Sequence, residues 1–146
     1  MFGKILVAVD GSEHAYKALD VAGDLAEKYG ASLLVSHIIV KPVIPSYFEG
    51  LAVEKAEQIY KTLGSEIAEK IFAECEARLG DRSLNSMKTA VAEGEPARAI
   101  TDLAEKEAVD LIAMGTRGLS GIRDVVIGSV AHKVTILSRC PVITVK

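Results

Sequence analysis

The sequence predicts a single α/β domain, built on an open five-stranded parallel sheet with helices on both faces. Strand-like and helix-like segments alternate along 146 residues, a length typical of one domain. The strand-like segments are continuous apolar runs, as in strands that are buried on both faces. Such alternation implies right-handed crossovers, which place helices over both faces of a parallel sheet.

The first strand and helix have clear boundaries. Residues 4–9 form an apolar run rich in β-branched side chains, which predicts a buried strand. Ser12 is a suitable N-cap for the helix that follows, and Gly30 a suitable left-handed C-cap after Tyr29. The spacing of the apolar residues predicts one buried helix stripe: Ala15, Ala18, Ala22, Leu25, Ala26 and Tyr29.

The middle of the chain predicts two more strands around a long helix. Residues 32–40 read as the second strand, and Lys41–Gly50 as a proline-containing loop. From Leu51 to Leu79 the apolar spacing is three or four, although Gly64-Ser65 could kink or split the helix. Ser86–Ala92 is a weaker third strand. The predicted helix stripe is Val53, Ala56, Tyr60, Leu63, Ile67, Ile71, Cys75 and Leu79.

The last part of the chain repeats the alternation. Pro96 lies in the first turn of a third helix, where its missing N–H is not needed. Residues 109–114 form the fourth predicted strand, Ser129–Ser138 the fourth helix and Pro141–Val145 the fifth strand. The apolar stripe of the third helix is Ala97, Ile100, Leu103 and Ala104.

Composition excludes several classes of protein. An apolar fraction of 49% excludes disorder. A net charge of −3, no Trp and 5% aromatic residues argue against nucleic-acid binding. The apolar runs are far shorter than the roughly 20 residues that span a bilayer. Asp10 interrupts the N-terminal apolar run early, which argues against a signal peptide. Two cysteines are too few for a disulfide framework. We therefore expect a cytoplasmic protein that does not enter a membrane.

Residues 114–130 are the segment of the sequence that most clearly suggests a ligand-binding site. This glycine-rich segment begins at a predicted strand end and finishes at a predicted helix start. Glycine allows close backbone approach, and the first turn of a helix offers free N–H groups to an anion. Ser129 could add a hydroxyl, and Arg117 or Arg123 a positive charge. The segment could therefore bind phosphate, or it could use its glycines only for turns.

Two common nucleotide-binding motifs do not match. A Walker A loop needs Lys before its Ser or Thr, whereas Ser129 directly follows Gly128. A dinucleotide-binding loop needs three close glycines after the first strand, where this chain has only Gly11.

The glycine pattern nevertheless resembles a known family. Gly115-x2-Gly118-x9-Gly128-Ser129 is similar to the signature of the ATP-binding branch of the universal stress proteins. The resemblance extends over the whole chain, residues 1–146, and includes three further segments: Val9-Asp10-Gly11-Ser12, Gly94-Glu95-Pro96-Ala97 and Cys140-Pro141-Val142. It implies an adenine nucleotide alpha hydrolase-like sheet with the strand order 3-2-1-4-5.

The resemblance also implies ligands and site residues. Asp10 would border the adenosine, the Ile38 backbone would read the adenine edge, and Met114 and Gly115 would lie under the ribose. The phosphates would be held by Gly118, Gly128, Ser129 and Val130. Bound phosphates usually bring Mg²⁺ or Mn²⁺ with them. The family resemblance further implies a homodimer through the last strand, Val142 to Val145, which has the uncharged character of an edge open to pairing.

Several alternatives remain open from the residues alone. Asp10 could be a turn residue or a helix cap rather than part of a site. A phospho-receiver domain shares the α/β order, but it needs an acceptor Asp after strand three, where Glu93-Gly94 stands. Tyr47 and Phe48 could form a lid, a partner contact or plain packing. We expect structural or surface roles for His37, His132, Cys75 and Cys140.

Three functions are consistent with these residues. The first is a stress-response or signalling module in which ATP orders the glycine-rich loop. The second is a weak ATPase that uses the same site, although no general base is evident apart from Asp10. The third is an interaction scaffold that binds no nucleotide.

Overall fold

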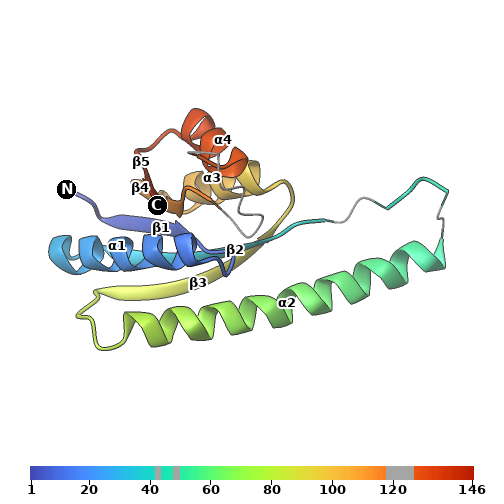
Figure 1. Ribbon diagram of the computed structural model, residues 1–146, viewed down its shortest axis with the longest axis horizontal. Helices are drawn as coiled ribbons and strands as arrows, with labels where there is room; N and C mark the ends of the chain where they lie inside the picture. Colours follow the sequence, from blue (N-terminus) through green and yellow to red (C-terminus); the bar gives the residue numbers. More distant parts are fainter. Residues whose placement is uncertain (42–43, 48–49, 118–126) are drawn as a thin grey trace.

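The computed structural model describes residues 1–41, 44–47, 50–117 and 127–146. These form one α/β domain (Figure 1). The elements in chain order are β1 (Lys4–Ala8), α1 (Glu13–Tyr29), β2 (Ser32–Ile39), α2 (Leu51–Leu79), β3 (Ser86–Glu93), α3 (Pro96–Lys106), β4 (Leu111–Gly115), α4 (Ser129–Leu137) and β5 (Val142–Val145).

The sheet confirms the predicted topology. Its five strands are parallel and follow the order β3-β2-β1-β4-β5. In the central register, Ile5 of β1 pairs with Leu33 of β2 and with Leu111 of β4. The strand order reverses at β1, so the carboxyl ends of β1 and β4 meet at the position where ligands bind in open α/β sheets.

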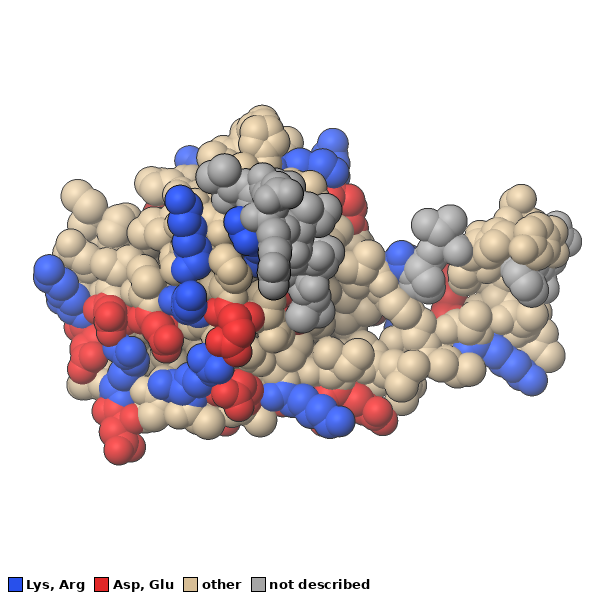
Figure 2. Space-filling view, viewed as in Figure 1, with Lys and Arg blue, Asp and Glu red and all other residues tan. Residues whose placement is uncertain are grey.

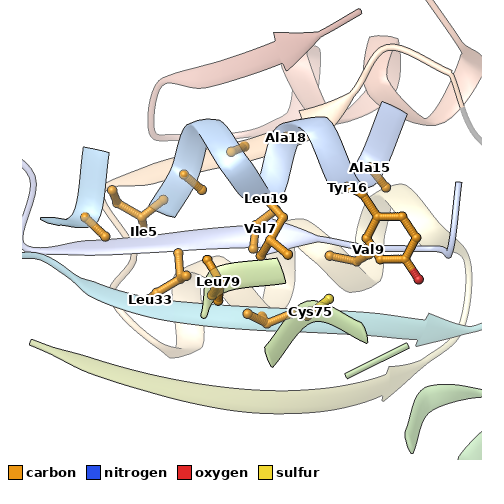
Figure 3. Packing of buried hydrophobic residues seen from close by; sticks show 14 of the residues in the cluster. Ile5, Val7, Val9, Ala15, Tyr16, Ala18, Leu19, Leu33, Cys75 and Leu79 are labelled. Atoms are coloured by element: carbon orange, nitrogen blue, oxygen red, sulfur yellow. The ribbon is translucent and has the colours of Figure 1, made fainter. Parts of the chain in front are cut away.

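Each face of the sheet has its own hydrophobic core. Ile5 and Val7 belong to the core beneath α1 and α2, whereas Leu6 belongs to the core beneath α3 and α4. Because successive strand residues point to opposite faces, a strand covered on both sides must be apolar throughout. Figure 3 shows the first of these cores, in which Leu19 of α1 and Cys75 of α2 meet the sheet.

The ends of α1 are capped as predicted. The Ser12 hydroxyl accepts a hydrogen bond from Ala15 N at 3.2 Å, and Gly30 adopts the left-handed conformation with φ of 65°. The buried face is wider than the predicted stripe, because Tyr16 and Leu19 are also buried. Tyr29 is instead 42% exposed at the helix end.

The long helix α2 is one continuous element across Gly64 and Ser65, so these residues do not split it. Only its C-terminal half is packed in the core, through Ile71, Cys75 and Leu79. Figure 1 shows the N-terminal half extending beyond the sheet. A helix of 29 residues is about 44 Å long, whereas the eight residues of β2 span about 26 Å. The length difference forces this overhang.

Some predicted strand boundaries shift for local reasons. The fourth strand begins at Leu111 rather than Val109, because Val109 N donates to Ala104 O at 2.9 Å in the turn that closes α3. The fifth begins at Val142, after Pro141.

The charged side chains are mixed on the face of the molecule that Figure 2 shows. On the face shown in Figure 2, acidic and basic side chains lie intermingled toward the part of the molecule occupied by α1 and the C-terminal half of α2. Within the ranges given above, no helix is both long enough and apolar enough to span a membrane.

Candidate functional site

A cavity of about 670 Å³ opens at the carboxyl ends of the strands. This volume lies within the range of small-molecule sites. Residues from β1, β2, β4 and α4, far apart in the sequence, line it together. Seven of the eight predicted site residues are among them: Asp10, Ile38, Met114, Gly115, Gly128, Ser129 and Val130. The eighth, Gly118, lies outside the described residues.

The end of β4 is packed unusually close to α1. A Cβ on Gly115 would lie 2.8 Å from the backbone carbon of His14 and 2.9 Å from Ala15 N. Only glycine permits this approach, because backbone atoms cannot move aside as a flexible side chain can. Gly115 therefore sets how closely the floor of the cavity lies to the first turn of α1.

Thr116 links the end of β4 to three neighbouring elements through hydrogen bonds. Its N–H donates to Val145 O at 2.8 Å, and its carbonyl accepts from Gly128 N. Its hydroxyl lies 3.3 Å from His14 Nδ1. Thr116 thus connects the end of β4 to β5, to the start of α4 and to α1. Sequence reasoning missed this residue, since nothing local distinguishes a buried Thr beside a glycine.

The N-terminus of α4 faces the cavity. Gly128 is its N-cap residue, and no side-chain cap hydrogen bond is formed there within the described part of the chain. Ser129, Val130 and Ala131, in the first turn, all line the cavity, and the Ser129 side chain is exposed. First-turn N–H groups carry the positive end of the helix dipole, so this end of the cavity suits an anion.

Asp10 forms a turn and also lines the cavity. Its Oδ1 accepts a hydrogen bond from Ser12 N at 2.9 Å, which is an Asx turn. The half-buried residue also lines the cavity. The turn therefore holds the carboxylate at the end of β1, beside the ligand space.

The backbone N–H and C=O of Ile38 point toward the β1 side of β2, into the space beyond the end of β1. Ser36 O accepts from Val9 N at 2.8 Å on the β1 side, while Ile39 O accepts from Gly94 N at 3.1 Å on the β3 side. Because backbone groups alternate in direction along a strand, those of Ile38 face β1. The β1 pairing ends at Ala8 opposite Ser36, so the backbone of Ile38 borders the cavity.

Helix α2 forms a wall of the cavity that sequence reasoning missed. Tyr60, Leu63, Gly64 and Ile67 line it, and Leu63 and Ile67 are 53% and 52% exposed. Sequence analysis assigned three of these side chains to the core because their spacing matched a buried stripe. The excess length of α2 over β2 was the available signal, since a helix longer than its strand reaches the end of the sheet, where the cavity opens.

Charge near the cavity comes from few groups. Arg117 lines it beside the start of the glycine-rich segment, whereas Arg123 lies outside the described residues. Among the residues that the structure describes, no three His, Cys, Asp or Glu side chains gather as a metal site.

The remaining candidates have structural or surface positions. The His37 ring is buried, and its Nδ1 donates to Val9 O at 2.8 Å, which confirms a satisfied histidine. His132 is exposed on α4. Cys75 is fully buried, and burial raises the pKa of its thiol to about 11, as expected for an inert core cysteine. Tyr47 is 79% exposed, and Phe48 lies outside the described residues.

Comparison with known proteins gives consistent matches over the full length. The sequence model of the Universal stress protein family matches residues 1–146. Universal stress protein YxiE of Bacillus subtilis is 36% identical over 149 residues, covering 100% of both chains. The solved structure of universal stress protein UspA from Lactobacillus plantarum has the same fold, with a TM-score of 0.86 at 23% identity over 99% of this chain and 97% of that one. A universal stress protein solved in complex with cAMP has a TM-score of 0.73 at 25% identity, again over 99% and 97%.

Proposed function

Because the chain belongs to the universal stress protein family, we propose that residues 1–146 form a cytoplasmic adenine-nucleotide-binding domain. We further propose that it acts in stress response or signalling as a switch whose state depends on bound ATP.

One observation carries the proposal. Residues that the sequence pattern marks as a nucleotide site come from three separate parts of the chain, and they line a single cavity. Asp10 follows β1, Ile38 lies in β2, and Gly115 and Gly128 flank the glycine-rich segment. That cavity lies at the reversal of strand order, where such sheets bind ligands. The related protein solved with cAMP supports the same class of ligand.

The geometry suggests how the two ends of a nucleotide would lie. The apolar strand ends and the Ile38 backbone suit the base, with Asp10 toward the adenosine and Met114 and Gly115 under the ribose. Ser129 and Val130, in the first turn of α4, suit the phosphates. Gly118 belongs to the same proposed phosphate site. Mg²⁺ or Mn²⁺, if bound with the phosphates, would neutralise part of their charge.

The test combines nucleotide binding with a variant at the phosphate end. We expect ATP to raise the melting temperature of the wild-type protein, with GTP giving a smaller effect. Ser129→Ala removes an exposed hydroxyl and should weaken ATP binding roughly 10-fold, the effect of losing a hydrogen bond to a charged group. Isothermal titration calorimetry measures this change. Ser65→Ala, which alters an exposed serine on α2 outside the cavity, is the matched control.

The possible results separate the three functions. Binding without phosphate release above a protein-free control supports the switch. Turnover that Ser129→Ala abolishes would instead establish a weak ATPase. If nucleotide-free wild-type protein binds no adenine nucleotide, the scaffold function replaces the proposal.

We also propose that the protein forms a homodimer through β5. This strand lies at one edge of the sheet, so one side of its backbone has no neighbouring strand in the described chain. An open edge is a template for pairing with a second copy. Thr116 N donates to Val145 O, so the same strand is bonded directly to the floor of the proposed nucleotide site.

A further inference from the structure

The hydroxyl of Tyr60 is exceptional among the side chains that the structure describes. Its oxygen is buried and has no hydrogen-bond partner in the described protein, and no other buried side-chain N or O atom there shares this condition. Burying a hydroxyl without a partner costs about 1–3 kcal/mol. A phenylalanine would provide the same ring without that cost, so the hydroxyl calls for a functional explanation.

Its position in the fold restricts the group that it could meet. Tyr60 lies on α2 and lines the main cavity together with Ile39 and Val40 at the end of β2. Helix α2 packs over β2 and β3, whereas α4 packs against α3 and β5 in the other half of the molecule. Tyr60 also lines a second, smaller cavity together with Lys41 and Glu93, and Glu93 pairs with Ile39 in the sheet. Tyr60 therefore lies at the β2 end of the cavity, beside the strand that borders the proposed base.

The chemistry of the hydroxyl suits such a contact. Burial, together with the negative charge of Glu93, raises the pKa of Tyr60 above its ordinary value. The group therefore stays protonated at neutral pH and can both donate and accept a hydrogen bond. An adenine edge offers ring nitrogens that accept and an amino group that donates.

We propose that the Tyr60 hydroxyl hydrogen-bonds the edge of a bound adenine, so that α2 and the Ile38 backbone hold the base from two sides. This inference rests on the proposed function, because it assigns one more contact to the same nucleotide site.

The test is Tyr60→Phe, measured by calorimetric titration with AMP. Loss of one neutral hydrogen bond should weaken AMP binding about 3–10-fold. The same loss is expected with 2′-deoxy-AMP, because its base is unchanged. Tyr29→Phe is the matched control, since Tyr29 lies on α1 against Phe2 and does not line the cavity. It should bind both nucleotides like the wild type.

The stability of the free protein separates a ligand contact from a structural one. Since the hydroxyl has no protein partner, Tyr60→Phe should leave the melting temperature of the free protein unchanged or slightly higher. A lower melting temperature accompanying the loss of affinity would assign Tyr60 a structural role and overturn the inference.

Two further results would also overturn it. A loss confined to AMP would place the hydroxyl at the ribose rather than the base. Unchanged affinity of Tyr60→Phe for AMP would show that the base does not contact it, while the proposed function stands. If the wild-type protein binds neither nucleotide, the proposed function itself fails, and the inference fails with it.

Discussion

At the scale of single residues, Gly115 shows how a binding-site glycine can act through packing. The sequence analysis placed it in a ligand loop because glycine lets a ligand approach the backbone. In the fold, the space that its missing Cβ leaves is occupied by the first turn of α1, through His14 and Ala15. Gly115 therefore has a packing role in the fold in addition to lining the cavity.

Gly115→Ala should reduce both stability and nucleotide binding. The new Cβ would meet backbone atoms of His14 and Ala15 at 2.8–2.9 Å, so β4 and α1 must separate. We expect a loss of about 1–3 kcal/mol in the free energy of unfolding, typical of overpacking. Urea denaturation measures it. Gly3→Ala is the control, because its Cβ would lie 3.4 Å from Asp110 Oδ2, an ordinary contact distance. Equal stability of the two variants would contradict the packing role.

At the scale of elements, α2 serves two purposes along its length. Its C-terminal half packs Ile71, Cys75 and Leu79 into the core, and its middle turns wall the cavity. Gly64 belongs to the cavity-lining turns, and a Cβ there would meet Ile39 side-chain atoms at 2.8–3.1 Å. The sequence analysis interpreted this glycine as a possible kink or break, whereas in the structure it permits a continuous helix to lie close to β2.

The contact between Gly64 and Ile39 can be tested by a double-mutant cycle. Gly64→Ala gains about 1 kcal/mol in helix propensity but forces α2 away from β2, so we expect net destabilisation of about 1–2 kcal/mol. Ile39→Ala removes the atoms that obstruct the Cβ. In that background Gly64→Ala should be neutral or stabilising, as measured by thermal or urea unfolding. Additive effects of the two substitutions would refute the contact.

At the scale of the whole molecule, β5 is an edge strand, and one side of its backbone has no neighbouring strand in the described chain. Pro141 O accepts a hydrogen bond from Ile112 N of β4, and Val145 O accepts one from Thr116 N, directly after β4. Alternation along the strand therefore directs the backbone groups of Val142 and Thr144 away from β4. These are the groups that a second copy of the chain would meet in the proposed dimer.

Thr144→Pro should convert the proposed dimer to a folded monomer. Proline removes an N–H on the open side of an edge strand, where the strand itself tolerates it. Sedimentation velocity measures the change in mass, and circular dichroism the fold. Ile143→Pro is the comparison, because its N–H faces β4 and its loss should destabilise the domain itself. Persistence of a dimer in Thr144→Pro would place the interface elsewhere, and a monomeric wild type would refute the dimer.

Much of the fold could be predicted from the sequence because it depends on local spacing. The apolar runs of β1 and β2 require a strand covered on both faces, and Ser12 and Gly30 mark the ends of α1 through backbone chemistry that neighbouring residues determine. The parallel direction of the strands follows from strand–helix alternation, whereas their order was implied by the family resemblance. The glycine pattern predicted that the C-terminal end of β4 and the start of α4 belong to one site. In the structure, both line the same cavity.

Only the tertiary structure decided which residues from distant parts of the chain come into contact. Periodicity identifies one face of a helix, but not whether a core or a cavity lies opposite each turn. Leu63 and Ile71 belong to the same stripe of α2, yet Ile71 is buried in the core whereas Leu63 lines the cavity and is largely exposed. Thr116, Tyr60 and the clearance at Gly115 likewise depend on contacts between segments distant in the chain. Such contacts are set by the relative placement of whole elements, which local spacing does not encode.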